Sequence, residues 1–166
     1  MTEPEITLVD AVPRLTAVVH GRLRPEDLPG FLGPAFEAVS TAVERQGAHV
    51  TGPPLTVYRK LGGAEFEVEA GFPVTTRIVP DGPVRPGELP GGPTVETIHI
   101  GRYATLPETY EKISSWLRVH GLQPGRLLWE SYLTDPADPE HRHPEGPRTL
   151  VVQPVEAELP AGTAGR

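Results

Sequence analysis

The chain has 166 residues, a net charge of −7 and no cysteine. The lack of cysteine excludes disulfides, thiolate metal sites and a cysteine nucleophile. The acidic balance argues against a nucleic-acid-binding face, which needs clustered basic residues. A chain of this length fits one domain, or two fused half-size units that share a core. Because the N-terminal stretch is acidic and no run reaches about 20 apolar residues, a cytoplasmic location without a membrane span is expected.

The first half of the chain predicts strands around one helix. The expected elements are strands at 6–12 and 15–23, an amphipathic helix at 28–46, and strands at 55–61 and 66–74. Pro13 separates the first two strands because it cannot donate to a ladder, and Gly47 ends the helix. The segment 75–93 holds five prolines and four glycines, which predicts that most of it is loop.

The second half predicts the same kinds of element. We expect a strand at 94–103, a helix that ends at Gly121, a strand at 127–133, a polar loop at 135–147 and a final strand at 149–155. Thr105 and Glu108 have the spacing of a capping box, which predicts that the helix begins there.

Landmarks of the two halves recur in one order, which predicts a tandem duplication of a strand–helix–strand–strand unit. Gly21–Leu23 corresponds to Gly101–Tyr103, the two helices correspond at a separation of 74, and Phe72–Val74 corresponds to Gln153–Val155. The first repeat covers about 5–75, the second about 93–156, and 157–166 is a tail of the same single domain. The predicted class is α+β, with antiparallel sheets, both helices on one side, and a ligand groove on the opposite side at the symmetry axis.

Glu130 interrupts an otherwise apolar strand. Alternation places Leu128, Glu130 and Tyr132 on one face of the strand and Trp129 on the other. A glutamate on an open, solvated face is the simpler interpretation, but both faces of this strand are apolar or aromatic. A carboxylate on a mostly dry wall must be paired or have a raised pKa. We therefore interpret Glu130 as a pocket carboxylate.

Aromatic residues are available to line the groove around that carboxylate. The candidates are Tyr58, Phe66, Phe72, Tyr103, Tyr110, Trp129 and Tyr132. Tyr110 has helix core as an alternative, and Trp116 is assigned to that core. Aromatic walls and one buried carboxylate suit a large, planar, lipophilic cation, because each ring contributes roughly 0.5–2 kcal/mol of cation–π attraction. Glu69 is a possible second pocket acid, whereas Glu65 and Glu67 are assigned to a solvated strand face.

Enzyme motifs are sparse in this sequence. It contains no Gly-x-Ser-x-Gly elbow, no His-Glu-x-x-His pair and no phosphate-binding glycine loop. His141 and His143 lie in a polar loop and make only a weak case for a metal, so neither a metal nor a cofactor is predicted. Glu130 remains the one candidate for a general acid or base.

Four stretches together resemble a known family. They are GPPLTVYRKLGGAEFEVEAGFPV (52–74), ELPGGPTVETIHIGRYATLPETYEKISSWLRVHGL (88–122), WESYLTDP (129–136) and TLVVQPV (149–155). The combination resembles the GyrI-like small-molecule-binding domain, the effector-binding module of AraC-type and MerR-type regulators, here expected as a stand-alone member. The resemblance implies that Glu130 lies in a central ligand pocket.

Three functions remain open at this stage. The leading hypothesis is a multidrug-binding protein for lipophilic, often cationic aromatic compounds, without nucleic acid or membrane as a partner. The alternative is a hydrolase of cyclopropanoid DNA-alkylating antibiotics, because the resemblance implicates a Trp-Glu pair, here Trp129 and Glu130, in some stand-alone relatives. Gyrase binding is disfavoured, because the acidic charge is not gathered in long runs.

Overall fold

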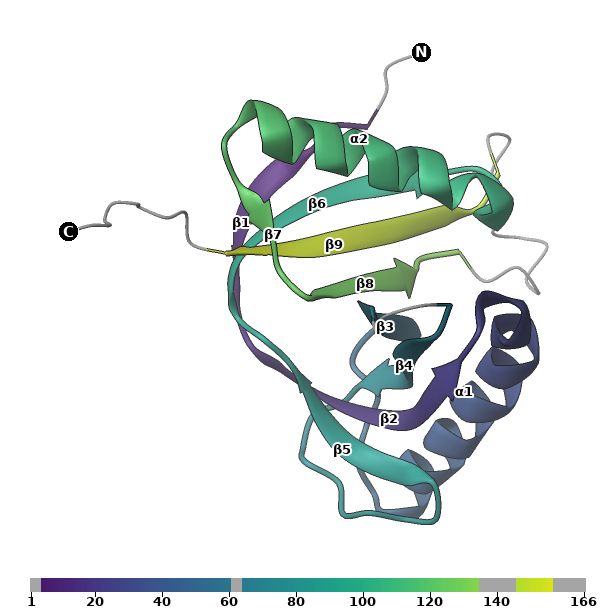
Figure 1. Cartoon of the computed structure of the whole chain (residues 1–166). Coiled ribbons are helices and arrows are strands. Elements are labelled where there is room, and N and C mark those ends of the chain that lie inside the picture. The colour runs from purple at the N-terminus through teal and green to yellow at the C-terminus, as the bar shows by residue number, and fades with distance from the viewer. Residues whose placement is uncertain (1–3, 61–63, 135–145, 157–166) are drawn as a thin grey trace.

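The computed structural model describes residues 4–60, 64–134 and 146–156. Figure 1 shows an α+β fold in which two helices accompany one antiparallel sheet. The strands are β1 (Thr7–Ala11), β2 (Arg14–Leu23), β3 (Leu55–Lys60), β4 (Phe66–Pro73), β5 (Val84–Leu89), β6 (Gly92–Ile100), β7 (Gln123–Pro124), β8 (Leu127–Tyr132) and β9 (Arg148–Glu156). The helices are α1 (Leu28–Arg45) and α2 (Leu106–Val119), and short 3₁₀ turns cover Pro25–Asp27 and Tyr103–Thr105. Within the described ranges, neither helix is long and apolar enough to cross a lipid bilayer.

The order of strands in the sheet is symmetric about its centre. The order is β1-β6-β9-β8-β3-β4-β2-β5, with β7 added beside β9. The unit β2-α1-β3-β4 therefore meets the unit β6-α2-β8-β9 at the β3–β8 pair. This arrangement confirms the predicted strand–helix–strand–strand pattern and places the pseudo-twofold axis between β3 and β8.

The sheet curls because its outer strands run from one half into the other. β1 continues into β2 and β5 into β6, while β1 pairs with β6 and β2 with β5. Side chains from strands far apart in the sheet order consequently meet inside the curl: Leu55, Val57, Leu89, Trp129 and Val152. The helices cover the other face, where each packs on its own apolar cluster. These apolar side chains occupy the side opposite the helices, where the groove was expected.

The structure refines three local expectations. Most of 75–93 lies outside strands, as expected, but β5 forms within it as an outermost strand, a position where Pro86 is tolerated. Tyr103 lies in a 3₁₀ turn rather than in a strand. The capping box is absent, because the Thr105 hydroxyl donates to the Arg102 carbonyl oxygen at 2.8 Å instead of capping the helix.

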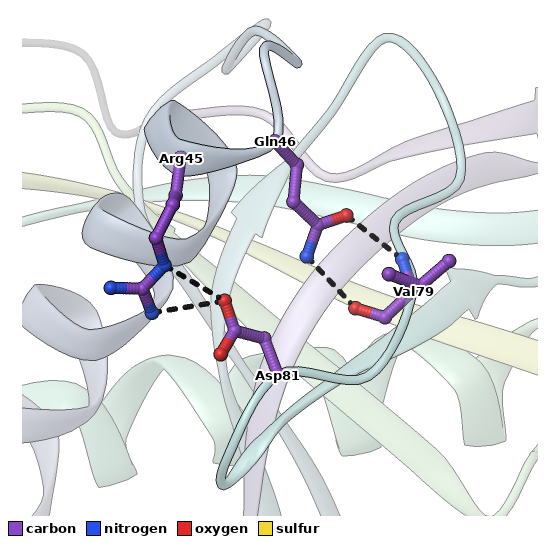
Figure 2. Close-up of polar contacts among 4 residues, drawn as sticks. All are labelled: Arg45, Gln46, Val79 and Asp81. Carbon is purple, nitrogen blue, oxygen red and sulfur yellow. Dashed lines mark hydrogen bonds and ion pairs between the residues drawn. The ribbon is translucent and has the colours of Figure 1, made fainter.

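The end of α1 is tied to the chain that leads into β5. Figure 2 shows Arg45 donating to Asp81 Oδ2 from Nε at 3.2 Å and from Nη2 at 2.9 Å. Gln46 donates from Nε2 to the Val79 carbonyl oxygen at 2.9 Å and accepts the Val79 N–H at 3.0 Å. These contacts hold residues 79–81 against the helix, so β5 enters the sheet from a fixed position.

Gly71 allows β2 and β4 to approach closely, which makes it a sharp test of the fold. A Cβ at this position would lie 1.9 Å from the Ala17 carbonyl oxygen. We expect Gly71→Ala to lower the free energy of unfolding by at least about 2 kcal/mol. Gly30→Ala, on the exposed side of α1 with no atom within 4 Å, should instead raise it by about 0.5–1 kcal/mol. Urea denaturation measures both variants, and equal effects would contradict the close approach.

Candidate functional site

Glu130 lies at the centre of the sheet, in the middle of β8. It pairs with Thr56 of β3 on one side and with Val151 of β9 on the other. Leu128, two residues earlier, packs into the α2 cluster, so Glu130 shares the helix-covered face. Only 3% of the residue is exposed. A side chain that usually stays in water is therefore buried on the helix-covered face of the sheet.

Two tyrosines donate hydrogen bonds to the same oxygen of this carboxyl group. Tyr58 Oη lies 3.2 Å and Tyr132 Oη 2.9 Å from Glu130 Oε1. Tyr132 Oη also lies 2.9 Å from Thr56 Oγ1. A tyrosine has a single hydroxyl proton. When Tyr132 donates that proton to Glu130, its oxygen can only accept a hydrogen bond from the Thr56 hydroxyl. The four side chains form one connected polar network.

The duplication explains why the tyrosines converge. Glu130 follows Thr56 by the same 74 residues by which Tyr132 follows Tyr58. Thr56 and Glu130 face each other directly across the β3–β8 pair, so both lie at the pseudo-twofold axis. Each tyrosine is two residues further along its own strand and therefore on the same face. The comparable positions predicted for Tyr58 and Tyr132 are found in the structure.

Burial controls the ionisation of this network. Loss of water raises the pKa of Glu130 to about 7, and the hydrogen bonds from Tyr132 and Tyr58 act in the opposite, lowering direction. Burial, followed by the neighbouring charge of Glu130, raises the pKa of both tyrosines, so both remain protonated donors. Among the described residues, no basic side chain forms an ion pair with Glu130. The carboxyl group is therefore balanced between its two forms near neutral pH.

Aromatic rings from both halves surround the polar network. The ring of Tyr132 makes edge contacts with Tyr103 at 5.9 Å and with Phe36 of α1 at 6.3 Å between centroids. Phe36 in turn contacts Phe72 at 5.9 Å, and Tyr58 contacts Phe66 at 5.7 Å. We call these six residues the aromatic cluster: Phe36, Tyr58, Phe66, Phe72, Tyr103 and Tyr132. Tyr103 is 40% exposed, so the cluster reaches the surface there.

Three of the predicted site residues lie elsewhere. Trp129 is on the opposite face of β8, packed inside the curl with Leu55 and Val57, because neighbours in a strand point to opposite faces. Glu69 pairs with Val57 and so faces the same way as Trp129. Tyr110 packs on the α2 cluster. The structure therefore brings none of these three side chains to Glu130.

Two residues of the site were missed from the sequence. Phe36 was assigned only to the apolar face of its helix, and helical periodicity does not separate core contacts from site contacts. Thr56 was not considered, although it precedes Glu130 by the repeat separation of 74. That separation was the available signal for Thr56.

Two hollows on the surface of the described residues lie away from Glu130. One, of about 670 Å³, runs beside α2 and is lined by residues such as Glu108, Trp116 and His120. Another, of about 430 Å³, lies between α1 and the turn at Asp81. We place the chemistry at Glu130 nevertheless, because neither hollow encloses a buried charge. In the part of the chain that the structure describes, no group of three or more His, Asp or Glu could hold a metal, and His141 and His143 lie outside it.

Solved structures share this fold. The EcmrR C-terminal domain superposes with a TM-score of 0.75 at 16% identity, covering 92% of this chain and 98% of that domain. In an EcmrR–DNA complex the EcmrR chain is longer, and this chain spans 59% of it. A hydrolase from Listeria innocua gives a TM-score of 0.62 at 14% identity, covering 94% of both chains. SAV2435 bound to tetraphenylphosphonium gives 0.58 at 8% identity, covering 92% of this chain and 94% of that one. At these identities the likenesses show the fold alone.

A family model shows more than the fold. No curated protein matches the chain. The model described as the GyrI-like small molecule binding domain, however, matches residues 4–146, most of the sequence. The chain belongs to the GyrI-like family of small-molecule-binding domains.

Proposed function

We propose that the chain binds lipophilic aromatic cations, with the ligand's charge against Glu130. One observation carries this proposal: a carboxyl group that is 3% exposed and has no basic partner among the described residues. Both tyrosines donate to Oε1, and no described side chain donates to Oε2. An ionised carboxylate that is buried without a cationic partner is strongly unfavourable, so a nearby positive charge would stabilise it. A cation that carries its own apolar surface supplies that charge without requiring water.

The aromatic cluster supports the same ligand class. Its rings would provide stacking surface and cation–π attraction of roughly 0.5–2 kcal/mol each. Rings adapt to ligands of different outline because they impose few hydrogen-bond directions, so a range of compounds is expected to bind. The family and the tetraphenylphosphonium bound to SAV2435 are consistent with this class. Since the rings of the cluster contact one another, we infer that the exposed Tyr103 moves aside to admit a ligand.

Binding of a cation is expected to be coupled to loss of a proton. The attracting form of Glu130 is the carboxylate, whereas the raised pKa of about 7 means that the group is largely protonated at pH 6. A cation stabilises the ionised form and so lowers the pKa of Glu130 in the complex. Affinity should therefore rise with pH up to about 7 and then level off.

Binding of tetraphenylphosphonium tests the proposal directly. Isothermal titration calorimetry should give a dissociation constant in the micromolar range, about tenfold weaker at pH 6 than at pH 8 because Glu130 must ionise. Glu130→Gln should weaken binding at pH 8 by at least about tenfold. The same substitution should have a much smaller effect on a neutral aromatic ligand such as triphenylphosphine oxide.

Glu69→Gln is the matched control for that experiment. It removes an equal charge from β4, which β3 separates from β8, and from the opposite face of the sheet. Its affinity for tetraphenylphosphonium should equal that of the unaltered chain. Equal losses in both variants, or equal losses for the cation and the neutral ligand, would contradict a direct contact with Glu130.

The ionisation of Glu130 can also be measured without a ligand. Because the pKa is about 7 in the folded chain and ordinary in the unfolded chain, this group favours the folded state most below pH 4.5, and its contribution is lost as pH rises to about 7. Between pH 5 and pH 8 the free energy of unfolding should fall further, by on the order of 3 kcal/mol, in the unaltered chain than in Glu130→Gln. Urea denaturation at both pH values measures this difference. Parallel changes in the two proteins would show that Glu130 is not perturbed.

Hydrolysis of cyclopropanoid antibiotics is a second candidate, favoured by the same pKa. A carboxyl group that titrates near 7 suits general acid–base catalysis at neutral pH. Glu130 would accept a proton from water as the water oxygen bonds to a ring carbon, and the conjugated part of the drug would take up the electrons of the broken ring bond. Trp129 would not contact the substrate directly, since its side chain packs on the opposite face of the sheet.

Mass spectrometry distinguishes the second candidate from simple binding. A cyclopropane-bearing aromatic substrate incubated with the protein should gain the mass of one water faster than in buffer, with repeated turnover. Glu130→Gln should abolish this rate above buffer, and Glu69→Gln should retain it. Tight binding without any product above the buffer rate would exclude hydrolysis of that substrate and leave the binding proposal intact.

A further inference from the structure

Thr149 of β9 is a fully buried residue whose hydroxyl has no partner. Its exposure is 0%, and Oγ1 makes no hydrogen bond within the part of the chain that the structure describes. It pairs with Tyr132 of β8 and with His99 of β6. Val151, two residues further along, packs into the α2 cluster, so Thr149 shares the helix-covered face with Glu130.

Other buried threonines of this sheet do not share this condition. Thr94 Oγ1 donates to the Val9 carbonyl oxygen at 3.4 Å, and Thr97 Oγ1 to that of Glu5 at 3.0 Å. Thr56 Oγ1 lies 2.9 Å from Tyr132 Oη. Burying a hydroxyl without a partner is unfavourable, and sheet residues at such positions are usually apolar or satisfied. The unsatisfied hydroxyl of Thr149 therefore departs from this pattern and calls for an explanation.

The neighbours of Thr149 cannot supply the missing hydrogen bond, because their polar atoms are engaged. His99 Nδ1 lies 2.7 Å from Thr109 Oγ1, and Nε2 lies 3.0 Å from the Arg102 carbonyl oxygen. The hydroxyl of Tyr132 is shared between Glu130 and Thr56. The ring of Tyr132 contacts Tyr103, so Thr149 lies at the flank of the aromatic cluster that reaches the surface.

We infer that the Thr149 hydroxyl is a second polar contact for the ligand, forming a hydrogen bond with a hydroxyl, carbonyl or amide group of a bound cation. This inference rests on the proposed binding at Glu130. Thr149 and Glu130 are diagonal neighbours on adjacent strands, whose backbones lie about 7–8 Å apart, so one ligand of the size of tetraphenylphosphonium can contact both side chains. The preferred ligand is an aromatic cation that carries one neutral polar group, rather than an entirely apolar one.

A pair of probes that differ in one hydroxyl tests this assignment. Tetraphenylphosphonium has no hydrogen-bonding group, whereas (4-hydroxymethylphenyl)triphenylphosphonium adds one alcohol to the same cation. Thr149→Val keeps the shape of the side chain and removes its hydroxyl. In calorimetric titrations this variant should bind the alcohol probe about five- to tenfold more weakly than the unaltered chain does, with no loss for tetraphenylphosphonium.

Thr94→Val is the matched control, because Thr94 is equally buried but its hydroxyl is already bonded on the opposite face. It should change neither affinity. An unchanged ratio of the two affinities in Thr149→Val would overturn the role of Thr149 while leaving the site at Glu130 in place. If neither probe binds the unaltered chain, the proposed function fails first, and this inference with it.

Thermal unfolding gives a readout that needs no ligand. Removing an unsatisfied hydroxyl should raise the melting temperature of Thr149→Val by at least about 2 °C, whereas Thr94→Val, which loses a hydrogen bond, should lower it. A lower melting temperature for Thr149→Val would show that its hydroxyl is already satisfied and would overturn the inference.

Discussion

Removal of the Glu130 carboxyl group from water is the interaction on which the arrangement of this domain depends. An isolated charge in this position would be strongly unfavourable. Two tyrosine hydroxyls stabilise it by donating hydrogen bonds, in place of a cation. Those hydroxyls are themselves fixed by the register of β3 against β8 and by Thr56. The aromatic rings around them keep water out and so raise the pKa of the acid. The ionisation of Glu130 thus depends jointly on the hydrogen bonds from the tyrosines and on the packing of the rings around them.

The curl of the sheet determines which face can hold this site. Strands that run from one half into the other bring β5 near β9, and the side chains between them fill the inside of the curl. What remains is the helix-covered face, where α1 and α2 each protect a separate apolar cluster. The central pair β3–β8 lies between these clusters, and Leu128 is its one residue that packs against either of them in the described part of the chain. A polar network is tolerated there because it replaces no core contact of either half.

Much of this arrangement follows from local patterns in the sequence. Periodicity and turn residues predicted both helices and the main strands, and alternation placed Glu130 and Tyr132 on one face of β8. Local patterns could not reveal the curl, because it depends on pairing between strands about 80 residues apart, such as Ala11 with Gly92. For the same reason β5 was missed, since its proline, Pro86, becomes acceptable at the edge of a completed sheet.

The site itself was predicted only in part, for equally physical reasons. Trp129 was joined to Glu130 by adjacency in the chain, although adjacency in a strand means opposite faces. Thr105 has the spacing of a capping residue, but its hydroxyl donates to the Arg102 carbonyl oxygen and lies 3.0 Å from His99 Nε2, local contacts that the capping-box spacing does not reveal. Phe36 was hidden among equally apolar residues of α1.

The position of Glu130 on the pseudo-twofold axis also bears on the history of the domain. In a symmetric pair of identical, separate chains, the residue at such a position faces a copy of itself. Two glutamates would then share one dry space and one proton, and two threonines would offer no charge at all. When the two repeats are joined in one polypeptide, the two positions at the axis no longer have to carry the same residue, because each repeat can mutate independently. A single negative charge at the exact centre of a near-symmetric fold is thus something that only a fused gene, and not a homodimer, can encode.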